Sequence, residues 1–207
     1  MARFVKLAAE GSIDFAVLRR LARDAGFEPS DEHGGRGKGQ LDLRLSGYNN
    51  AAKFESWIVC RDLDKDAPCP GGLASVKLPK TATYMCFRIA VRSIEAWMTA
   101  DRIGFANFFH VVESNVSIEP ELIEDPKLET LRLLAKSSLR GVRDAMVRKN
   151  RDGSLSAGPE YNSLFIEFVT EKWKPERASK SSQSLRRARQ RITDLARFCE
   201  ENLPGRA

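Results

Sequence analysis

Acidic side chains have the most informative spacing in this sequence. Asp62, Asp64 and Asp66 alternate in the run Arg61-Asp-Leu-Asp-Lys-Asp, directly after the apolar segment 56–60. Hard divalent cations need several anionic oxygens, and an Asp-x-Asp pair on a loop at the end of a strand supplies two of them. We therefore interpret Asp62 and Asp64 as metal ligands, with Asp66 as a third. The alternative is that this acidic run is a solvated turn.

A second acidic motif, Glu10-Gly11, follows the apolar segment 3–9. Glycine at this position lets the backbone turn sharply and lets a phosphate or a metal approach closely. Ligands of parallel sheets bind beyond the carboxyl ends of the strands, and both acidic motifs follow expected strands. We therefore predict that Glu10, Asp62 and Asp64 form one catalytic site, with their carboxylates within roughly 8 Å of one another.

The scarcity of other ligands narrows the choice of metal. The chain has two histidines and four dispersed cysteines without a Cys-x-x-Cys pair, so carboxylates must hold the metal, which favours Mg²⁺ or Mn²⁺ over zinc.

Such cysteines predict free thiols in a reducing compartment. No apolar stretch approaches the ~20 residues that span a bilayer, and the N-terminus lacks a secretory signal. We expect a cytoplasmic protein that does not associate with membranes.

Positive charge is concentrated near the end of the chain. Residues 172–197 hold nine Lys and Arg against Glu176 and Asp194, whereas the whole chain has a net charge of +6. This segment is interpreted as a nucleic-acid-binding surface, with Arg186, Arg187 and Arg191 contacting phosphates. A solvated basic helix face and a docking surface for an acidic partner protein are the alternatives.

The elements that must position these side chains follow from the apolar patterning. Strands are expected over 3–9, 56–60 and 84–91, with a helix over 13–25 after the first strand. The polar, glycine-rich segment 28–39 is expected to be a loop, and the ambiguous segment 40–53 favours a helix. Beyond residue 94 the chain is expected to be helical, over 127–136, 139–149, 160–173 and 184–202. This order predicts an α/β fold with a mostly parallel sheet flanked by helices and a largely helical C-terminal half.

Four segments together resemble a known domain. A strand ending in Glu10-Gly11 and a later strand ending in Asp62-x-Asp64 resemble the Toprim domain of topoisomerases, primases and OLD-type nucleases. The segments Arg88–Asp101 and Pro175–Leu185 are similar to a narrower bacterial Toprim-like family found near phage-defence genes, with RloB-type proteins among its relatives. The resemblance extends from about residue 3 to residue 195. It implies a Toprim-like core over 1–110 and a helical portion over 111–207.

The resemblance also implies roles for individual residues. Glu10 matches the Toprim glutamate, a general acid/base or metal-linked residue, and Asp62 and Asp64 match its two Mg²⁺ ligands. Glu95 matches an acidic residue of the narrower family, and Trp97, two residues later, is interpreted as core packing.

The function predicted from these observations is Mg²⁺-dependent hydrolysis of nucleic-acid phosphodiesters within an anti-phage defence module. Lys38, Arg61 and Arg92 are the auxiliary cations expected to offset phosphate charge. The main alternative is a non-catalytic subunit that binds nucleic acid or a partner ATPase, with a vestigial acidic site. A small-molecule phosphotransfer enzyme is a third interpretation, although no Walker motif is present. The sequence also leaves open whether the chain forms a homodimer.

Overall fold

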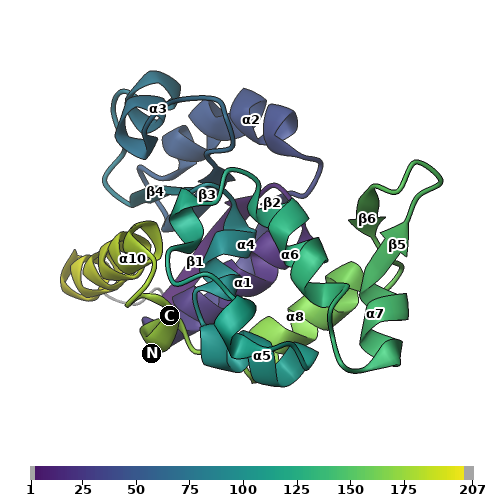
Figure 1. The fold of residues 1–207 in the computed structure, drawn as a ribbon. Helices are drawn as coiled ribbons and strands as arrows, with labels where there is room; N and C mark the ends of the chain where they lie inside the picture. Colours follow the sequence, from purple (N-terminus) through teal and green to yellow (C-terminus); the bar gives the residue numbers. More distant parts are fainter. Residues whose placement is uncertain (1–2, 203–207) are drawn as a thin grey trace. The chain divides into compact units, whose positions relative to one another are not determined.

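The expected strands belong to a four-stranded parallel sheet (Figure 1). The computed structural model describes residues 3–202. Its strands are β1 (Arg3–Ala9), β2 (Phe27–Gly34), β3 (Trp57–Asp62) and β4 (Met85–Ala90), in the order β2-β1-β3-β4. Most side chains of β1 and β3 are buried, which explains their continuous apolar runs. The predicted α/β class is confirmed.

The prediction of a loop over 28–39 is wrong, because Phe27–Gly34 forms strand β2. This strand lies at the edge of the sheet and pairs only with β1. An edge strand gains its stability from backbone hydrogen bonds to one neighbour, so most of its side chains can stay exposed and polar. Pro29 is tolerated for the same reason, since an edge strand does not need every N–H.

Helices cover both faces of this sheet. α1 (Ser12–Asp24) buries its apolar side against one face, and α2 (Lys38–Ala51) covers the other. The alternation of β3 side chains shows the two faces, because Trp57 stacks on Tyr48 of α2 whereas Cys60 lies near Asp14 of α1. The helix favoured for 40–53 is thus confirmed. α3 (Pro70–Lys77) follows β3 and contacts β4.

The described chain divides into two compact units. The first contains the parallel sheet, with the residues up to Ala90 and those from Arg186 onward, which include most of α10 (Gln183–Asn202). The second is Val91–Leu185. The division expected at residue 110 concerns domain organisation and stays a prediction.

The second unit is mainly helical and has its own aromatic core. Trp97, Phe105, Phe109, Phe165 and Trp173 are buried in it, which confirms the packing role expected for Trp97. Its helices are α4 (Ile94–Thr99), α5 (Arg102–Phe109), α6 (Pro126–Leu134), α7 (Arg140–Met146), α8 (Tyr161–Glu171) and α9 (Pro175–Ala178), with short 3-10 turns at Glu113–Asn115 and Pro120–Leu122.

The helix predicted over 139–149 is wrong at its end. α7 stops at Met146, and Val147–Lys149 forms strand β5, which pairs antiparallel with β6 (Leu155–Ala157). Gly153 has a positive φ of 83° in the connecting turn, a conformation that glycine adopts readily. This turn therefore forms a β-hairpin from residues that the helical pattern had assigned to the end of a longer helix. Among residues 3–202, no helix combines the length and apolar character needed to cross a membrane.

Candidate functional site

The strand order has a topological switch point between β1 and β3. From β1 the chain passes through α1 to β2 on one side, and from β2 through α2 to β3 on the other. The direction of the connections reverses here, so the loops after β1 and β3 diverge to opposite faces. In parallel sheets this reversal is the usual place for a ligand. The first acidic residue follows β1 and the second ends β3, so the acidic motifs lie at the reversal.

Glu10 and Asp62 are joined by a hydrogen bond at this switch point, which we call the acidic site. The backbone N–H of Asp62 donates to Oε1 of Glu10 at 2.9 Å. Burial raises the pKa of the Glu10 carboxyl above its usual value, the bond from Asp62 opposes this shift, and the charge of Asp64 adds to it. Glu10 is therefore a carboxylate that retains a proton more readily than a solvated one, as suits a proton-transferring group.

Asp64 is held in the left-handed region of the backbone, with a φ of 49°. This conformation is uncommon for a residue with a side chain, although aspartate tolerates it better than most. Oδ2 of Asp64 lies 2.7 Å from the Nζ of Lys38, and the same ammonium lies 3.2 Å from Oδ1 of Asp66. The bond to Asp64 is the main reason that the pKa of Lys38 is raised. Two carboxylates thus converge on one cation.

The glycine-rich segment 34–39 positions Lys38 at the site. Its backbone runs past the end of β1, where Gly35 donates to the carbonyl of Ala9 at 2.9 Å and Gly37 donates to the carbonyl of Glu10 at 3.0 Å. Gly34 has a φ of 107°, and a Cβ there would collide with the Ala9 carbonyl oxygen. The glycines therefore let the loop approach β1 closely.

Arg61 connects the acidic loop to α2. It is 2 % exposed, and Nε and Nη2 bind the carboxylate of Asp42 at 2.8 and 3.2 Å. Nη2 also binds Asp66 at 2.5 Å, and Nη1 donates to the carbonyl oxygen of Asp62 at 2.6 Å. Hydrogen bonds from Arg61 and then Lys38 hold the pKa of Asp66 below its usual value. Arg61 therefore fixes the loop rather than facing open solvent.

Two members of this charge network were missed at the level of the sequence. Asp42 accepts from Lys77 of α3 at 2.6 Å as well as from Arg61. Burial raises the pKa of the Asp42 carboxyl, but the bonds from these two cations outweigh it and leave the pKa below its usual value. Nothing local in the sequence marks either residue, because they meet only when α2 and α3 pack.

The acidic residues remain close without forming a preassembled metal shell. Burial, followed by the negative charges of Asp62, Asp14 and Glu10, raises the pKa of the Cys60 thiol well above its usual value. Within residues 3–202, no group of three or more His, Cys, Asp or Glu side chains is arranged to hold a metal ion as it stands.

Two other predicted residues belong to the second unit. Glu95 is buried in α4, where it accepts hydrogen bonds from Ser93 Oγ at 2.7 Å and from the hydroxyl of Tyr161 at 3.3 Å. Burial, then the charge of Glu95, raises the pKa of Tyr161 above its usual value. Glu95 thus takes part in a core network of that unit. Arg92, two residues after β4, is half-buried.

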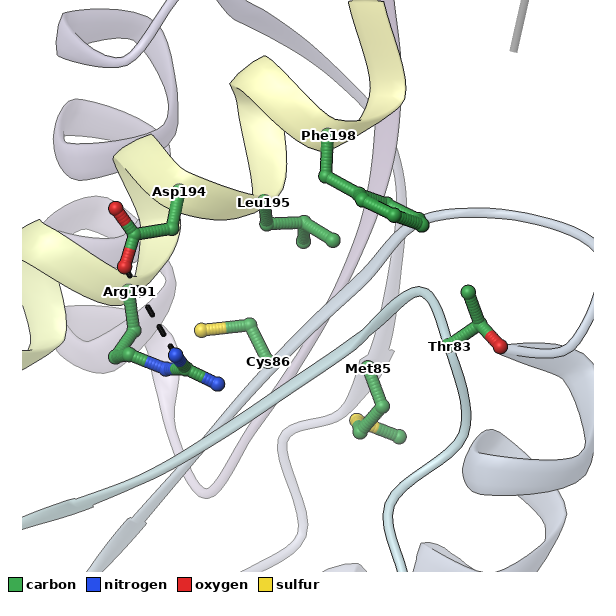
Figure 2. Close-up of a pocket in the computed structure, with 7 residues that line it drawn as sticks. All are labelled: Thr83, Met85, Cys86, Arg191, Asp194, Leu195 and Phe198. Atoms are coloured by element: carbon green, nitrogen blue, oxygen red, sulfur yellow. Dashed lines mark ion pairs between the residues drawn. The ribbon is translucent and has the colours of Figure 1, made fainter. Parts of the chain in front are cut away.

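The arginines of α10 differ in their surroundings. Arg186 and Arg187 are exposed, and neither forms an ion pair within the described chain. Arg191 pairs with Asp194 at 3.9 Å and lines a pocket of about 300 Å³ with Cys86, Leu195 and Phe198, among others (Figure 2). Burial raises the pKa of the Cys86 thiol to about 11. All four cysteines are free, as predicted.

A second basic surface, on the β5–β6 hairpin, was not expected. Arg148, Lys149 and Arg151 are exposed there, and none of them pairs with an acidic side chain among residues 3–202. The one carboxylate of the turn, Asp152, accepts from the backbone and hydroxyl of Ser154. The signal for this basic surface in the sequence was the run of cations between residues 148 and 151.

Comparison with known proteins does not extend these observations. The chain matches no protein-family model, no curated protein and no solved structure.

Proposed function

We propose that the protein is a divalent-metal-dependent phosphodiester hydrolase that acts on nucleic acid. The hydrogen bond between Glu10 and the amide of Asp62 is the main support for this proposal. This bond joins the two acidic motifs at the point where the strand order reverses, and Lys38 and Arg61 contact the loop that follows β3. A link to anti-phage defence rests on the resemblance in sequence and stays a prediction.

The donor chemistry of the acidic site suits Mg²⁺ or Mn²⁺. The candidate ligands, Glu10, Asp62 and Asp64, offer carboxylate oxygens, and hard cations prefer such oxygens. The convergence of Asp64 and Asp66 on the ammonium of Lys38 supports the idea that this position stabilises positive charge. A metal bound through Oδ2 of Asp64 would compete with Lys38 for that oxygen.

Each side chain then has a distinct task. Glu10, whose pKa burial raises, takes up or releases a proton. Asp62 and Asp64 would hold the metal, which when bound supplies an activated water and stabilises the leaving oxygen. Lys38, once released from Asp64, is free to neutralise a phosphate. Arg61 holds the loop that carries both aspartates.

Nucleic acid is the proposed substrate because unpaired cations are exposed on two surfaces, α10 and the β5–β6 hairpin. A small phosphorylated substrate would not require either surface, whereas a phosphate backbone interacts with many cations at once.

One observation favours a second candidate function. Lys38, Arg61 and Lys77 already neutralise the carboxylates of Asp42 and Asp66 and engage Asp64. Such a network can simply stabilise the loop, in which case the protein is a non-catalytic nucleic-acid-binding subunit.

Metal binding and cleavage, measured on the same variants, distinguish the two functions. Mn²⁺ should raise the melting temperature of the wild-type protein, because a ligand bound only by the folded state stabilises it. Asp62→Asn with Asp64→Asn should abolish that shift and also the cleavage of labelled single- and double-stranded DNA and RNA. The control is Asp24→Asn with Asp31→Asn, which removes the same charge from exposed positions.

Two results contradict the hydrolase proposal. One is cleavage by the Asp62→Asn, Asp64→Asn variant at the wild-type rate. The other is a wild-type protein that binds nucleic acid but neither binds Mn²⁺ nor cleaves, which identifies the non-catalytic subunit.

A further inference from the structure

A pocket in the unit Val91–Leu185 combines apolar and basic side chains. Its volume is about 540 Å³, within the range of small-molecule sites. Ile103 and Phe108 of α5 form an apolar part, and Lys172, Lys174 and Arg177 form a basic part. No Asp or Glu among the described residues lines it. The lining therefore favours a ligand with a negative charge and an apolar portion.

Arg177 is held in place from behind by a buried carboxylate. Asp101 is 0 % exposed and accepts from both Nε and Nη2 of Arg177, the second at 2.9 Å. It also accepts from the backbone N–H of Lys174 at 2.8 Å and of Gly104 at 3.1 Å. Because Nε and Nη2 of Arg177 donate to Asp101, the N–H groups of Nη1 lie on the other side of the guanidinium, away from Asp101. These donors are available to a ligand.

Gly104 makes this close pairing possible. A Cβ at this position would collide with the carboxylate of Asp101 and would lie 2.7 Å from Nη2 of Arg177. Burying a carboxylate is costly unless it is fully hydrogen-bonded, and here a guanidinium and two amides satisfy it. The arrangement keeps an arginine side chain, which is otherwise flexible, in one orientation at the pocket.

The two lysines supply charge that no neighbour neutralises fully. Lys174 is exposed, and its ammonium forms no ion pair within residues 3–202. Lys172 is also exposed and approaches only Glu171, at 3.8 Å. Arg177 is balanced by Asp101 and attracted by Glu113, so the lysines provide the excess charge. Two positive charges and a fixed guanidinium match a phosphate group that carries close to two negative charges at neutral pH.

We propose that this pocket binds a phosphomonoester with an aromatic body, of about the size of a nucleoside monophosphate. The phosphate contacts Lys172, Lys174 and Arg177, and the ring lies on Ile103 and Phe108. This pocket shares no residue with the acidic site and does not depend on the function proposed for that site.

Titration calorimetry with three probes tests the proposal. AMP, inorganic phosphate and adenosine are added separately to the full chain in the presence of EDTA, which keeps divalent metal from the acidic site. AMP should bind more tightly than either fragment. Lys172→Ala with Lys174→Ala should weaken AMP binding by about tenfold or more, since this variant removes two charge-assisted hydrogen-bond donors. Both lysines are exposed, so this variant should fold.

The matched control is Lys127→Ala with Lys136→Ala, which removes two exposed lysines from the surface of the same unit. Its affinity for AMP should stay within about twofold of the wild-type value. Three results overturn the proposal: no binding of AMP to the wild-type chain, equal binding of AMP and adenosine, or equally weakened AMP binding in the two double variants. The last would show attraction by net charge instead of a site.

Discussion

Removing Arg61 should destabilise the sheet unit strongly, although its charge lies next to a proposed active site. In Arg61→Met the apolar stem is kept and the guanidinium is removed. Three hydrogen bonds to Asp42 and Asp66 disappear, together with one to the carbonyl of Asp62. The guanidinium side chain is only 3 % exposed, so water does not already satisfy these groups.

The expected decrease in the free energy of unfolding is about 3 kcal/mol. Breaking a buried pair by removing one partner costs about 3–5 kcal/mol. The lower end applies here, because Asp42 keeps Lys77, Asp66 keeps Lys38, and their side chains are 18 % and 32 % exposed to water. With an m-value of about 2 kcal/mol/M, the midpoint of urea unfolding should fall by about 1.5 M.

Urea unfolding followed by circular dichroism and tryptophan fluorescence measures this decrease, and hydrogen exchange locates it at amides 62–66. Arg44→Met is the control, since Arg44 is exposed on α2 and should change stability by less than about 0.5 kcal/mol. The pKa values of Asp42 and Asp66 lie below the usual 3.8, so their stabilisation is complete above pH 3.8 and disappears as the pH falls through their folded-state values. The difference between Arg61→Met and wild type should shrink over the same range. A decrease below about 1 kcal/mol at neutral pH would refute the reasoning.

Three further predictions concern the acidic site and the basic helix α10. Glu10→Gln should stabilise the fold at neutral pH. The pKa of the Glu10 carboxyl is raised, so Glu10 contributes stability at low pH and this contribution is lost as the pH rises past 4.5. Melting curves at several pH values measure the effect, and a gain in stability that is largest in acid contradicts the prediction. Lys38→Met should tighten Mn²⁺ binding severalfold in calorimetry, since the competing ammonium is gone; unchanged or weaker affinity argues against displacement of Lys38 by the metal. Replacing three arginines of α10 by alanine should weaken nucleic-acid binding for all sequences alike. It should also lower the slope of log affinity against log salt by about one for each phosphate that is no longer neutralised. An unchanged slope would mean that this helix face is only solvated or binds a partner protein. The residues replaced are Arg186, Arg187 and Arg191.

The sequence predicted the central part of the fold because the signals involved are local. Buried parallel strands are continuous apolar runs, so β1, β3 and β4 were recognisable, and α10 shows one apolar stripe at helical spacing. Acidic residues directly after two such runs gave Glu10, Asp62 and Asp64 as candidates. Each of these inferences depends on a few neighbouring residues.

The edge strand β2 and the hairpin strand β5 could not be predicted in this way. β2 is stabilised by backbone pairing with β1, and backbone groups are the same for every side chain. β5 exists because a turn at Gly153 brings β6 alongside it. The periodicity of one segment carries no information about which other segment will pair with it.

The pairing of charges was decided by the tertiary structure alone. Lys38 reaches Asp64 only because the strand order places the loop after β2 beside the ends of β1 and β3. Asp101 and Arg177 meet across 76 positions of the chain. A charged residue in a sequence has many possible partners, since its long side chain and the range of Coulomb attraction impose no spacing. Packing of distant elements selects one partner, and with it whether the charge stabilises the fold or remains available to a ligand.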